Sequence, residues 1–208
     1  MKAALFLMGC ICLDALLGME IANGPYRYIL TRDLNNMNGN RMMVIGCNPS
    51  VANANDDDNT IKRVKGIATN LGYNGFIMAN LFAYRETQPE VMQNNVVQGN
   101  QNSFSEAIGQ NIVVNGINGQ QVTLGNWNDY YIKEAARDPS VTSVVFAYGD
   151  IAVNNKWNQF QSEALKRVEA VKAAIRETGK PMYAFKITQC GNPQHPLHVP
   201  IGPLVQLY

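Results

Sequence analysis

The residues of this chain that are able to do chemistry fall in a few short polar stretches. The first is Asn48-Pro49-Ser50, which directly follows an apolar run. Pro49 fixes its own φ and restricts Asn48, so this turn is stiff and holds the Asn48 amide in one place. An amide offers a donor pair and an acceptor, which suits contact with a base edge, a bound water or an oxyanion. An Asx-type turn that binds no ligand is an equally good interpretation.

The second stretch is the acidic run Asp56-Asp57-Asp58, which stands just before an expected helix. Carboxylates at a helix N-terminus are stabilised by the helix dipole, so capping is the simplest interpretation. The chemical alternatives are a general base, for which Asp58 is our candidate, and a ligand of Mg²⁺. The sequence has neither a P-loop lysine motif nor a Gly-x-Gly-x-x-Gly run, and it indicates no cofactor.

The third stretch contains both histidines of the chain, His195 and His198, within residues 191–198. This clustering favours a catalytic role for His195, because an imidazole donates to a developing oxyanion or moves a proton near neutral pH. A metal site formed by Cys190 and both histidines is the alternative. Three ligands within nine residues form a weak metal pattern, so we expect no metal here.

The other candidates would bind a ligand. Tyr84 and Arg85 can stack on a base or hold an anionic group, and the alternative is a solvated loop with an ion pair between Arg85 and Glu86. The remaining candidates stand at the ends of expected strands and are Pro49, Ser50, Asn80, Gly149, Asn192 and His198.

Alternating strands and helices must position these residues. Near-continuous apolar runs predict buried strands at 41–46, 75–83, 141–148 and 181–188. Helical spacing predicts a helix that ends at about 71 and has Thr60 or Asn59 as its N-cap. It also predicts helices over 126–137 and over about 157–175. This order predicts a three-layer α/β/α sandwich with a mostly parallel central sheet of about four core strands. Parallel strands place the polar tips at one sheet edge, where ligands bind in open α/β sheets.

Other segments surround this core. Residues 21–25 predict a turn, and the alternating aromatic and basic residues of 26–32 predict a half-buried strand. Two Asn-Gly pairs within 111–124 predict a β-hairpin, inside an insertion that is either a lid on the active face or a decorative loop. We expect a single domain over 1–208, with an N-terminal helix in 1–20, core segments 26–90 and 125–200, and the insertion at 91–124.

The composition describes a globular protein. The chain has 208 residues, of which 46% are hydrophobic and 16% charged, and its net charge is +1. A net charge this close to zero argues against tight nonspecific binding to nucleic acid, which needs many Lys and Arg contacts to phosphates. Four cysteines without CxxC spacing favour buried thiols in a reducing compartment, so we expect a cytoplasmic protein. The N-terminal apolar run is too short to span a membrane; a lipoprotein anchored through Cys10 is the alternative.

Six short motifs occur in order along the chain: Tyr26-Arg-Tyr-x-Leu-x-Arg32, Asn48-Pro-Ser, Asp57-Asp58-x-Thr60-Ile61, Asn80-Leu-Phe-Ala-Tyr-Arg85, Tyr148-Gly149 and Gly191-x-Pro-x-His-Pro-Leu197. This ordered set resembles a bacterial and phage family known only as domain of unknown function 1643. The resemblance covers about Tyr26 to His198, and the family has no established activity. Tyr148 stands where the family usually has Trp.

A more distant likeness rests on three segments, Gly46-Cys-Asn48-Pro, 145–149 and His195-Pro196. In this order they are similar to the first motif, the Leu-Leu-Trp-Gly strand and the second motif of the uracil-DNA glycosylase superfamily. The resemblance implies an α/β/α fold in which Asn48 orients the attacking water and His195 stabilises the anion of the leaving base. Leu197 stands where the second motif has Ser, the position that this resemblance links to DNA intercalation.

Three hypotheses of function follow. The first is an enzyme that cleaves the bond between a nucleobase and its sugar, in nucleic acid or in a free nucleotide. The second is a phage or host defence protein that binds a nucleotide or nucleotide-derived signal without chemistry. The third is a metal-dependent hydrolase that uses Asp57, Asp58 and the histidines. The expected partner is thus a nucleobase, nucleotide or nucleic acid, and the sequence does not indicate an oligomeric state.

Overall fold

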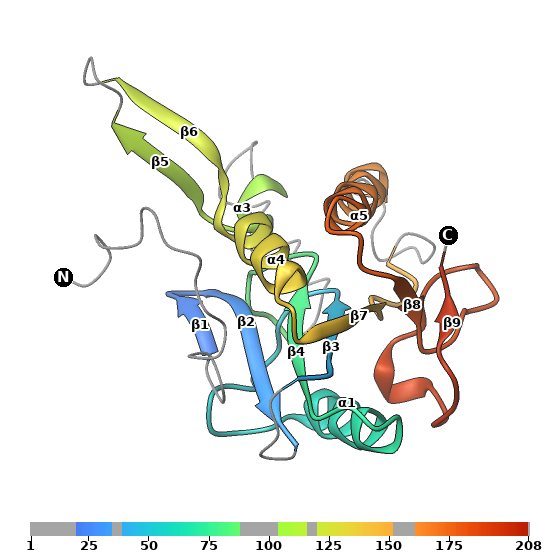
Figure 1. Ribbon diagram of the computed structural model, residues 1–208. Coiled ribbons are helices and arrows are strands. Elements are labelled where there is room, and N and C mark those ends of the chain that lie inside the picture. Colours follow the sequence, from blue (N-terminus) through green and yellow to red (C-terminus); the bar gives the residue numbers. More distant parts are fainter. Residues whose placement is uncertain (1–19, 35–38, 88–103, 116–119, 152–160, 208) are drawn as a thin grey trace.

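A mixed seven-stranded sheet forms the centre of the computed structural model, which describes residues 20–34, 39–87, 104–115, 120–151 and 161–207. The strand order is β1-β2-β4-β3-β7-β8-β9, as Figure 1 shows. The strands are β1 (Glu20–Asn23), β2 (Tyr26–Asp33), β3 (Arg41–Gly46), β4 (Gly75–Asn80), β7 (Val141–Phe146), β8 (Met182–Ala184) and β9 (Val205–Gln206).

The four inner strands β4, β3, β7 and β8 run parallel, which confirms the predicted parallel core. Every residue of β3 and β4 is buried, and burial on both faces explains their continuous apolar character. Three predicted strands are shorter than expected, and the one predicted over 141–148 ends at Phe146. The run 75–83 leaves the strand after Asn80, and only Met182–Ala184 of 181–188 forms a strand.

The outer strands are antiparallel to their neighbours, and the predicted turn at 21–25 is wrong in part. Glu20–Asn23 forms β1, which pairs with β2, and the turn is confined to Gly24 and Pro25. Strand β2 runs antiparallel to β4, so the start of β2 lies at the edge where the parallel strands end. The backbone N–H of Arg27 accordingly donates to the carbonyl of Ala83, at 2.9 Å.

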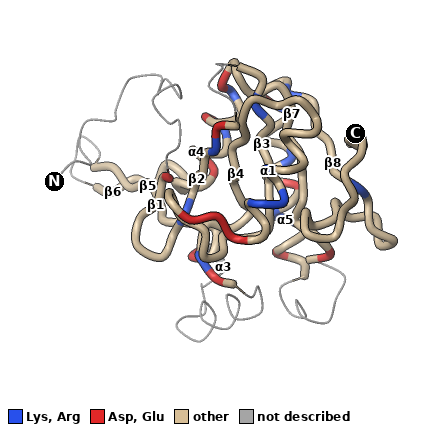
Figure 2. Tube along the Cα trace, turned by 90° about the horizontal axis from the view of Figure 1, so that it is seen from below, with Lys and Arg blue, Asp and Glu red and all other residues tan. Residues whose placement is uncertain are grey.

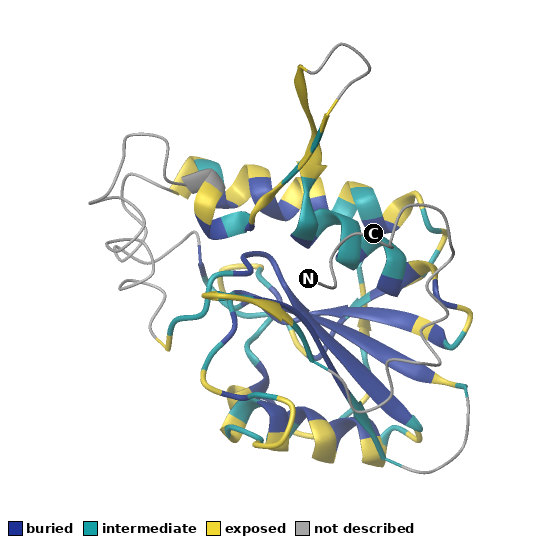
Figure 3. Ribbon diagram, turned by 90° about the vertical axis from the view of Figure 1, so that its left-hand side faces the viewer, coloured by how far each residue is buried: buried dark blue, intermediate teal, exposed yellow. Residues whose placement is uncertain are grey.

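Helices cover both faces of the sheet (Figures 1 and 3). Helix α1 (Asn59–Asn70) packs on one face through Ile61, Val64 and Ile67, against Met42, Val44 and other sheet residues. Helices α4 (Trp127–Arg137) and α5 (Gln161–Arg176) cover the other face. The predicted layers are therefore present. The expected N-cap of α1 is wrong, because Asp58, and not Asn59 or Thr60, caps the helix.

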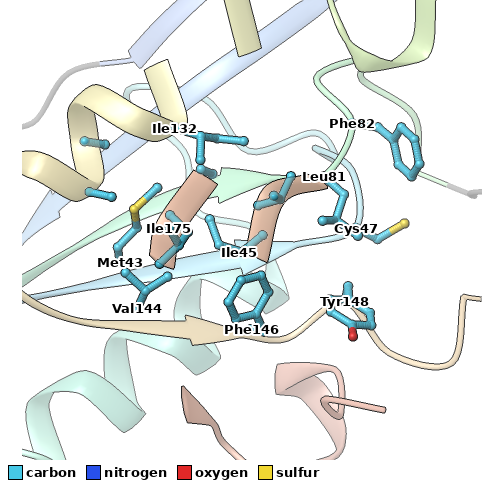
Figure 4. Packing of buried hydrophobic residues seen from close by; sticks show 14 of the residues in the cluster. Met43, Ile45, Cys47, Leu81, Phe82, Ile132, Val144, Phe146, Tyr148 and Ile175 are labelled. Atoms are coloured by element: carbon cyan, nitrogen blue, oxygen red, sulfur yellow. The ribbon is translucent and has the colours of Figure 1, made fainter. Parts of the chain in front are cut away.

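The larger apolar cluster lies between the sheet and the pair α4 and α5. Figure 4 shows Met43 and Ile45 of β3 facing Ile132 of α4 and Ile175 of α5, with Phe146 of β7 beside them. All five of these side chains are at most 1% exposed. Close packing on this face fixes the β3 and β7 backbones up to the points where their terminal loops begin.

A β-hairpin of β5 (Asn111–Asn115) and β6 (Gln121–Asn126) extends away from the sheet after the short helix α3 (Phe104–Ile108), as Figures 1 and 3 show. The predicted hairpin is confirmed, and its role as a lid stays a prediction. The predicted N-terminal helix, residues 91–103 of the insertion, Cys10 and the start of the 157–175 helix lie outside the described residues. Within the described residues, the helices are too short or too polar to cross a bilayer.

Candidate functional site

A cavity of about 420 Å³ lies where β3 and β4 end, at the edge of the sheet that the sequence predicts. Ligand sites of small molecules are concavities of this size, on the order of 300–1,000 Å³. The N-terminus of α1 and the loop with His195 complete its wall. The residues with polar side chains that line it are Arg27, Asn48, Ser50, Asp58, Asn59, Thr60, Asn80, Glu86, Thr87, Tyr148 and His195.

The structure brings five of the predicted site residues together around this cavity: Asn48, Ser50, Asp58, Asn80 and His195. All three predicted catalytic residues are among them. The other candidate ligand-binding residues do not line it, and these are Pro49, Tyr84, Arg85, Gly149, Asn192 and His198. The cavity thus unites segments that are far apart in sequence, while their chemical roles stay predictions.

Asn48 is held so that its oxygen is left for a ligand. Its Nδ2 donates to the carbonyl of Glu86 at 2.6 Å and, more weakly, to that of Pro49 at 3.3 Å. Both partners are acceptors, so the nitrogen must face them, and this settles which way the amide points. Oδ1 has no hydrogen-bond partner among the described residues. Asn48 therefore offers the cavity an acceptor, which suits a water molecule.

Asn80 is the most deeply buried polar side chain of the cavity wall, with 1% of its surface exposed. Neither its Oδ1 nor its Nδ2 has a hydrogen-bond partner within the described part of the chain. Leaving a buried donor or acceptor unpaired costs about 1–3 kcal/mol. An unpaired group of this kind at a cavity wall needs an explanation, and a ligand with a matching donor and acceptor would satisfy it.

Two side chains behind the cavity hold the chain around Asn80. Nδ2 of Asn128 donates to the carbonyls of Asn80 and Leu81, both at 3.1 Å. Nε of Arg167 donates to the Leu81 carbonyl at 2.6 Å, and Arg167 forms an ion pair with Asp129. Asn128 and Arg167 are buried, so these contacts replace the strand hydrogen bonds that end at Asn80.

The two carboxylate oxygens of Asp58 have different surroundings. Oδ1 accepts from the backbone N–H of Ile61 at 2.8 Å, which makes Asp58 the N-cap of α1. The simplest interpretation of the acidic run is confirmed for this residue. Oδ2 has no hydrogen-bond partner among the described residues, and the side chain borders the cavity. Oδ2 can therefore accept a hydrogen bond from a ligand or a water in the cavity.

His195 is half-buried, and its imidazole is neutral at pH 7. Burial and the neighbouring His198 lower the pKa of His195 below 6.5, and Asp58 opposes them. Nδ1 accepts from the backbone N–H of Leu197 at 3.4 Å, at the start of the 3₁₀ turn Pro196–His198. In a neutral imidazole with Nδ1 as acceptor, the proton is on Nε2. His195 therefore acts as a donor through Nε2–H.

Gly149 and Asn192 hold the loop of His195 and do not reach the cavity. The Gly149 N–H donates to the Pro193 carbonyl at 2.8 Å, and its φ of 74° lies in the left-handed region that favours glycine. Nδ2 of Asn192 donates to Asp150 at 2.9 Å. These contacts tie the loop to the end of β7, so both residues are positioning residues.

Tyr84 and Arg85 contact other parts of the protein, and their expected ligand contacts stay a prediction. Tyr84 packs edge-on against Tyr26, with ring centroids 5.8 Å apart, and Arg85 forms an ion pair with Glu20. The alternative pairing of Arg85 with Glu86 is not what the structure shows either. The aromatic ring at the cavity is Tyr148, which follows β7 (Figure 4). Burial, reinforced by Glu169, raises the pKa of Tyr148 to about 12.

Sequence analysis missed Arg27, which is 3% exposed and lines the cavity. Its Nη1 donates to the Ala52 carbonyl, while its Nε is unpaired within the described residues. Burial and the neighbouring Arg85 lower the pKa of Arg27 to about 10, so the guanidinium is charged at pH 7. The motif Tyr26-Arg27-Tyr28 was a signal for this residue, but only the strand order shows which sheet edge it reaches.

Two hypotheses of the sequence analysis involve a metal ion. The described residues contain no group of three or more His, Cys, Asp or Glu side chains able to hold one. Asp57 forms an ion pair with Arg32 at 2.7 Å. His195 and His198 lie with their ring centroids 6.0 Å apart.

Comparison with known proteins identifies the family. The family model described as a protein of unknown function, DUF1643, matches residues 27–197. The chain belongs to this family. The match begins at Arg27 and ends at Leu197, two residues that line the cavity, so the DUF1643 region spans the whole site. No curated protein and no solved structure matches the chain.

Proposed function

We propose that this DUF1643 protein hydrolyses the bond between a nucleobase and its sugar in the cavity at the ends of β3 and β4. The observation that carries the proposal is the buried, unpaired amide of Asn80. A nucleobase edge presents donors and acceptors side by side, and a side-chain amide pairs with two of them at once. Enzymes that act on bases recognise them by such contacts inside a closed pocket.

The other groups supply the parts of a hydrolysis. Oδ1 of Asn48 orients a water, and Oδ2 of Asp58 accepts a proton as the water oxygen bonds to the anomeric carbon. The bond from that carbon to the base nitrogen breaks, and its electron pair stays on the base. Nε2–H of His195 donates a hydrogen bond to the developing base anion, and a neutral imidazole suits this task. Tyr148 offers the aromatic surface against the base.

The likeness to uracil-DNA glycosylases supports the proposal at the level of fold and motif order. Helices cover both faces of a mainly parallel sheet, and the Asn48 turn and the His195 loop meet at one cavity. A glycosylase-like architecture is part of the proposal. Fold likeness alone does not carry function, so the weight rests on the cavity groups.

The test is release of free base, measured by liquid chromatography, from nucleosides, nucleotides and single-stranded and duplex oligonucleotides with normal and modified bases. The variants Asn48→Ala and His195→Ala should lose about 100-fold or more in rate while keeping the circular dichroism of the native protein. Asn126→Ala is the matched control, because it removes the N-cap of α4, away from the cavity. Wild-type protein that releases no base from any member of the panel would refute the hydrolase.

A second candidate is a protein that binds a nucleotide or a nucleotide-derived signal without chemistry, in phage or host defence. The observation that favours it is Asp58, whose carboxylate already serves as a helix cap. A cavity with an unpaired amide and a fixed cation is sufficient for binding alone. Calorimetric binding followed by recovery of the intact ligand would support this candidate, and recovery of free base and sugar would exclude it.

A further inference from the structure

We propose that Arg27 forms an anion subsite of this cavity and that the substrate is a free nucleoside monophosphate, whose phosphate it holds. This inference rests on the proposed function and narrows its substrate class. An Arg guanidinium binds phosphate through parallel N–H donors, in a geometry that few other side chains reproduce. Base recognition by Asn80 and phosphate recognition by Arg27 would then act at two parts of one ligand.

Arg27 differs from its arginine neighbours in having no carboxylate partner. Arg32, on the same strand, pairs with Asp57 at 2.7 Å, and Arg85 pairs with Glu20. Within the described residues, Arg27 forms no ion pair, and the one hydrogen bond of its guanidinium goes to a neutral carbonyl, that of Ala52. A buried charge without a partner is costly, so the arrangement favours an anionic ligand that completes it.

The acidic residues at the cavity do not neutralise Arg27. Asp58 favours its charged form from a distance, yet the two side chains form no ion pair. Oδ1 of Asp58 is bonded to the Ile61 N–H, and Oε1 of Glu86 accepts from the Thr87 N–H at 2.7 Å. The cation therefore keeps donors for a ligand. Nε and Nη2 of Arg27 have no hydrogen-bond partner among the described residues.

The burial of Arg27 and the charge distribution favour a free nucleotide over a base in duplex DNA. Only a ligand that enters the cavity reaches a guanidinium that is 3% exposed. The net charge is +1, and Figure 2 shows basic and acidic residues dispersed among the elements. Duplex binding depends on several surface cations that contact consecutive phosphates. A single buried cation suits the single phosphate of a monophosphate.

Calorimetry on the full-length protein tests the inference with three ligand types: nucleosides, their 5′-monophosphates and short single-stranded oligonucleotides of the same base. The wild-type protein should bind the best monophosphate at least about tenfold more tightly than its nucleoside. Arg27→Gln should remove that difference, and Arg27→Lys should keep part of it.

Arg32→Gln is the matched control. Both arginines lie on β2 and both hold the loop after β3, Arg27 through the Ala52 carbonyl and Arg32 through the Asn53 carbonyl at 2.6 Å. Arg32 does not line the cavity, so its variant should loosen the loop and preserve the preference for the monophosphate. If Arg32→Gln removes the preference as fully as Arg27→Gln does, Arg27 acts through the loop and the inference is overturned.

The outcomes separate this inference from the proposed function. Equal affinity for nucleoside and monophosphate, or tighter binding of the oligonucleotide than of the monophosphate, overturns the inference and leaves base recognition intact. If no nucleoside or nucleotide binds, the proposed function and the monophosphate assignment both fail.

A thermal-shift titration with inorganic phosphate then tests the anion subsite by itself. A thermal shift of the wild type that Arg27→Gln lacks supports the subsite, and equal shifts overturn it.

Discussion

The side chain of Asn80 lies directly over Gly46, on the neighbouring strand. A Cβ atom on Gly46 would come 2.7 Å from Oδ1 of Asn80 and 2.7 Å from the terminal methyl group of Met78. Real Cβ atoms do not approach other atoms so closely, so any larger residue at 46 must displace both Asn80 and Met78. The absence of a side chain at Gly46 thus makes room for the Asn80 amide at the cavity wall.

Gly46→Ala should disturb the site more than the fold. We expect a loss of about 1–3 kcal/mol in the free energy of unfolding, as for other overpacked positions. Base release should fall at least about tenfold, because Asn80 is displaced.

Gly66→Ala is the control, since a Cβ there meets nothing within 4 Å in the middle of α1. That change should stabilise the protein by about 0.5–1 kcal/mol. Urea unfolding and base-release assays measure both effects; unchanged activity of Gly46→Ala would contradict the role of Asn80.

Asp58 has a cap function and a proposed proton-acceptor function, and two substitutions separate them. Asp58→Asn should keep the stability of the wild type, because Asn caps helices as well as Asp does. Asp58→Ala should lose about 0.5–2 kcal/mol of unfolding free energy in denaturant titrations. Both should lose base release, since neither side chain accepts a proton. An active Asp58→Asn variant would show that the carboxylate is a cap and not a general base.

Arg167 is expected to stabilise the chain around Asn80 from behind. Arg167→Met removes one of the two donors to the Leu81 carbonyl, the other being Nδ2 of Asn128. It also removes the ion-pair partner of Asp129, whose side chain is 44% exposed. The unfolding free energy should fall by about 2–3 kcal/mol, at the low end for a buried pair because Asp129 is partly solvated. Substrate affinity should fall as well, because Asn80 is less well positioned.

The control for Arg167 is Arg137→Met, on α4. Arg137 pairs with Glu134 at 2.8 Å, but its side chain is 55% exposed, so this change should cost no more than about 0.5 kcal/mol. Urea unfolding of both variants, with calorimetry of the best ligand, provides the measurement. Equal stability of the two variants would show that the Leu81 contact contributes little.

His195 should make stability depend on pH near neutrality. Burial and His198 lower its pKa in the folded protein, Asp58 opposes this, and the unfolded chain has the ordinary value of 6.5. A lowered histidine pKa means that the unfolded chain binds more protons as pH falls through 6.5, so the folded state loses stability below that value. Urea midpoints at about pH 7.5 and about pH 5.5 measure the loss.

The variant His195→Gln should flatten this pH dependence, because the titrating group is gone. Gln194→Ala, the neighbouring change, leaves His195 in place and should retain the slope. The same dependence in wild type and His195→Gln would assign it to other groups.

Sequence alone determined the parallel core and the edge at which the polar loops meet. The strands β3, β4 and β7 are buried at almost every position and are rich in apolar residues, so their runs were visible. Polar residues such as Asn48 and Asn80 stand at or just beyond the strand ends. The Asn-Gly pairs predicted the β5–β6 hairpin for a local reason, the left-handed turn conformation. The N-cap of α1 is Asp58, one residue before the predicted cap at Asn59 or Thr60.

Only the tertiary structure decided which polar residues share the cavity. Tyr84 and Arg85 stand near Asn80 in sequence, yet they turn to Tyr26 and Glu20, while Arg27 arrives on a strand that runs the other way. Strand direction and pairing order are set by contacts between distant segments, and no local pattern specifies them. Sequence therefore predicted where a site should be, and packing selected the side chains that form it.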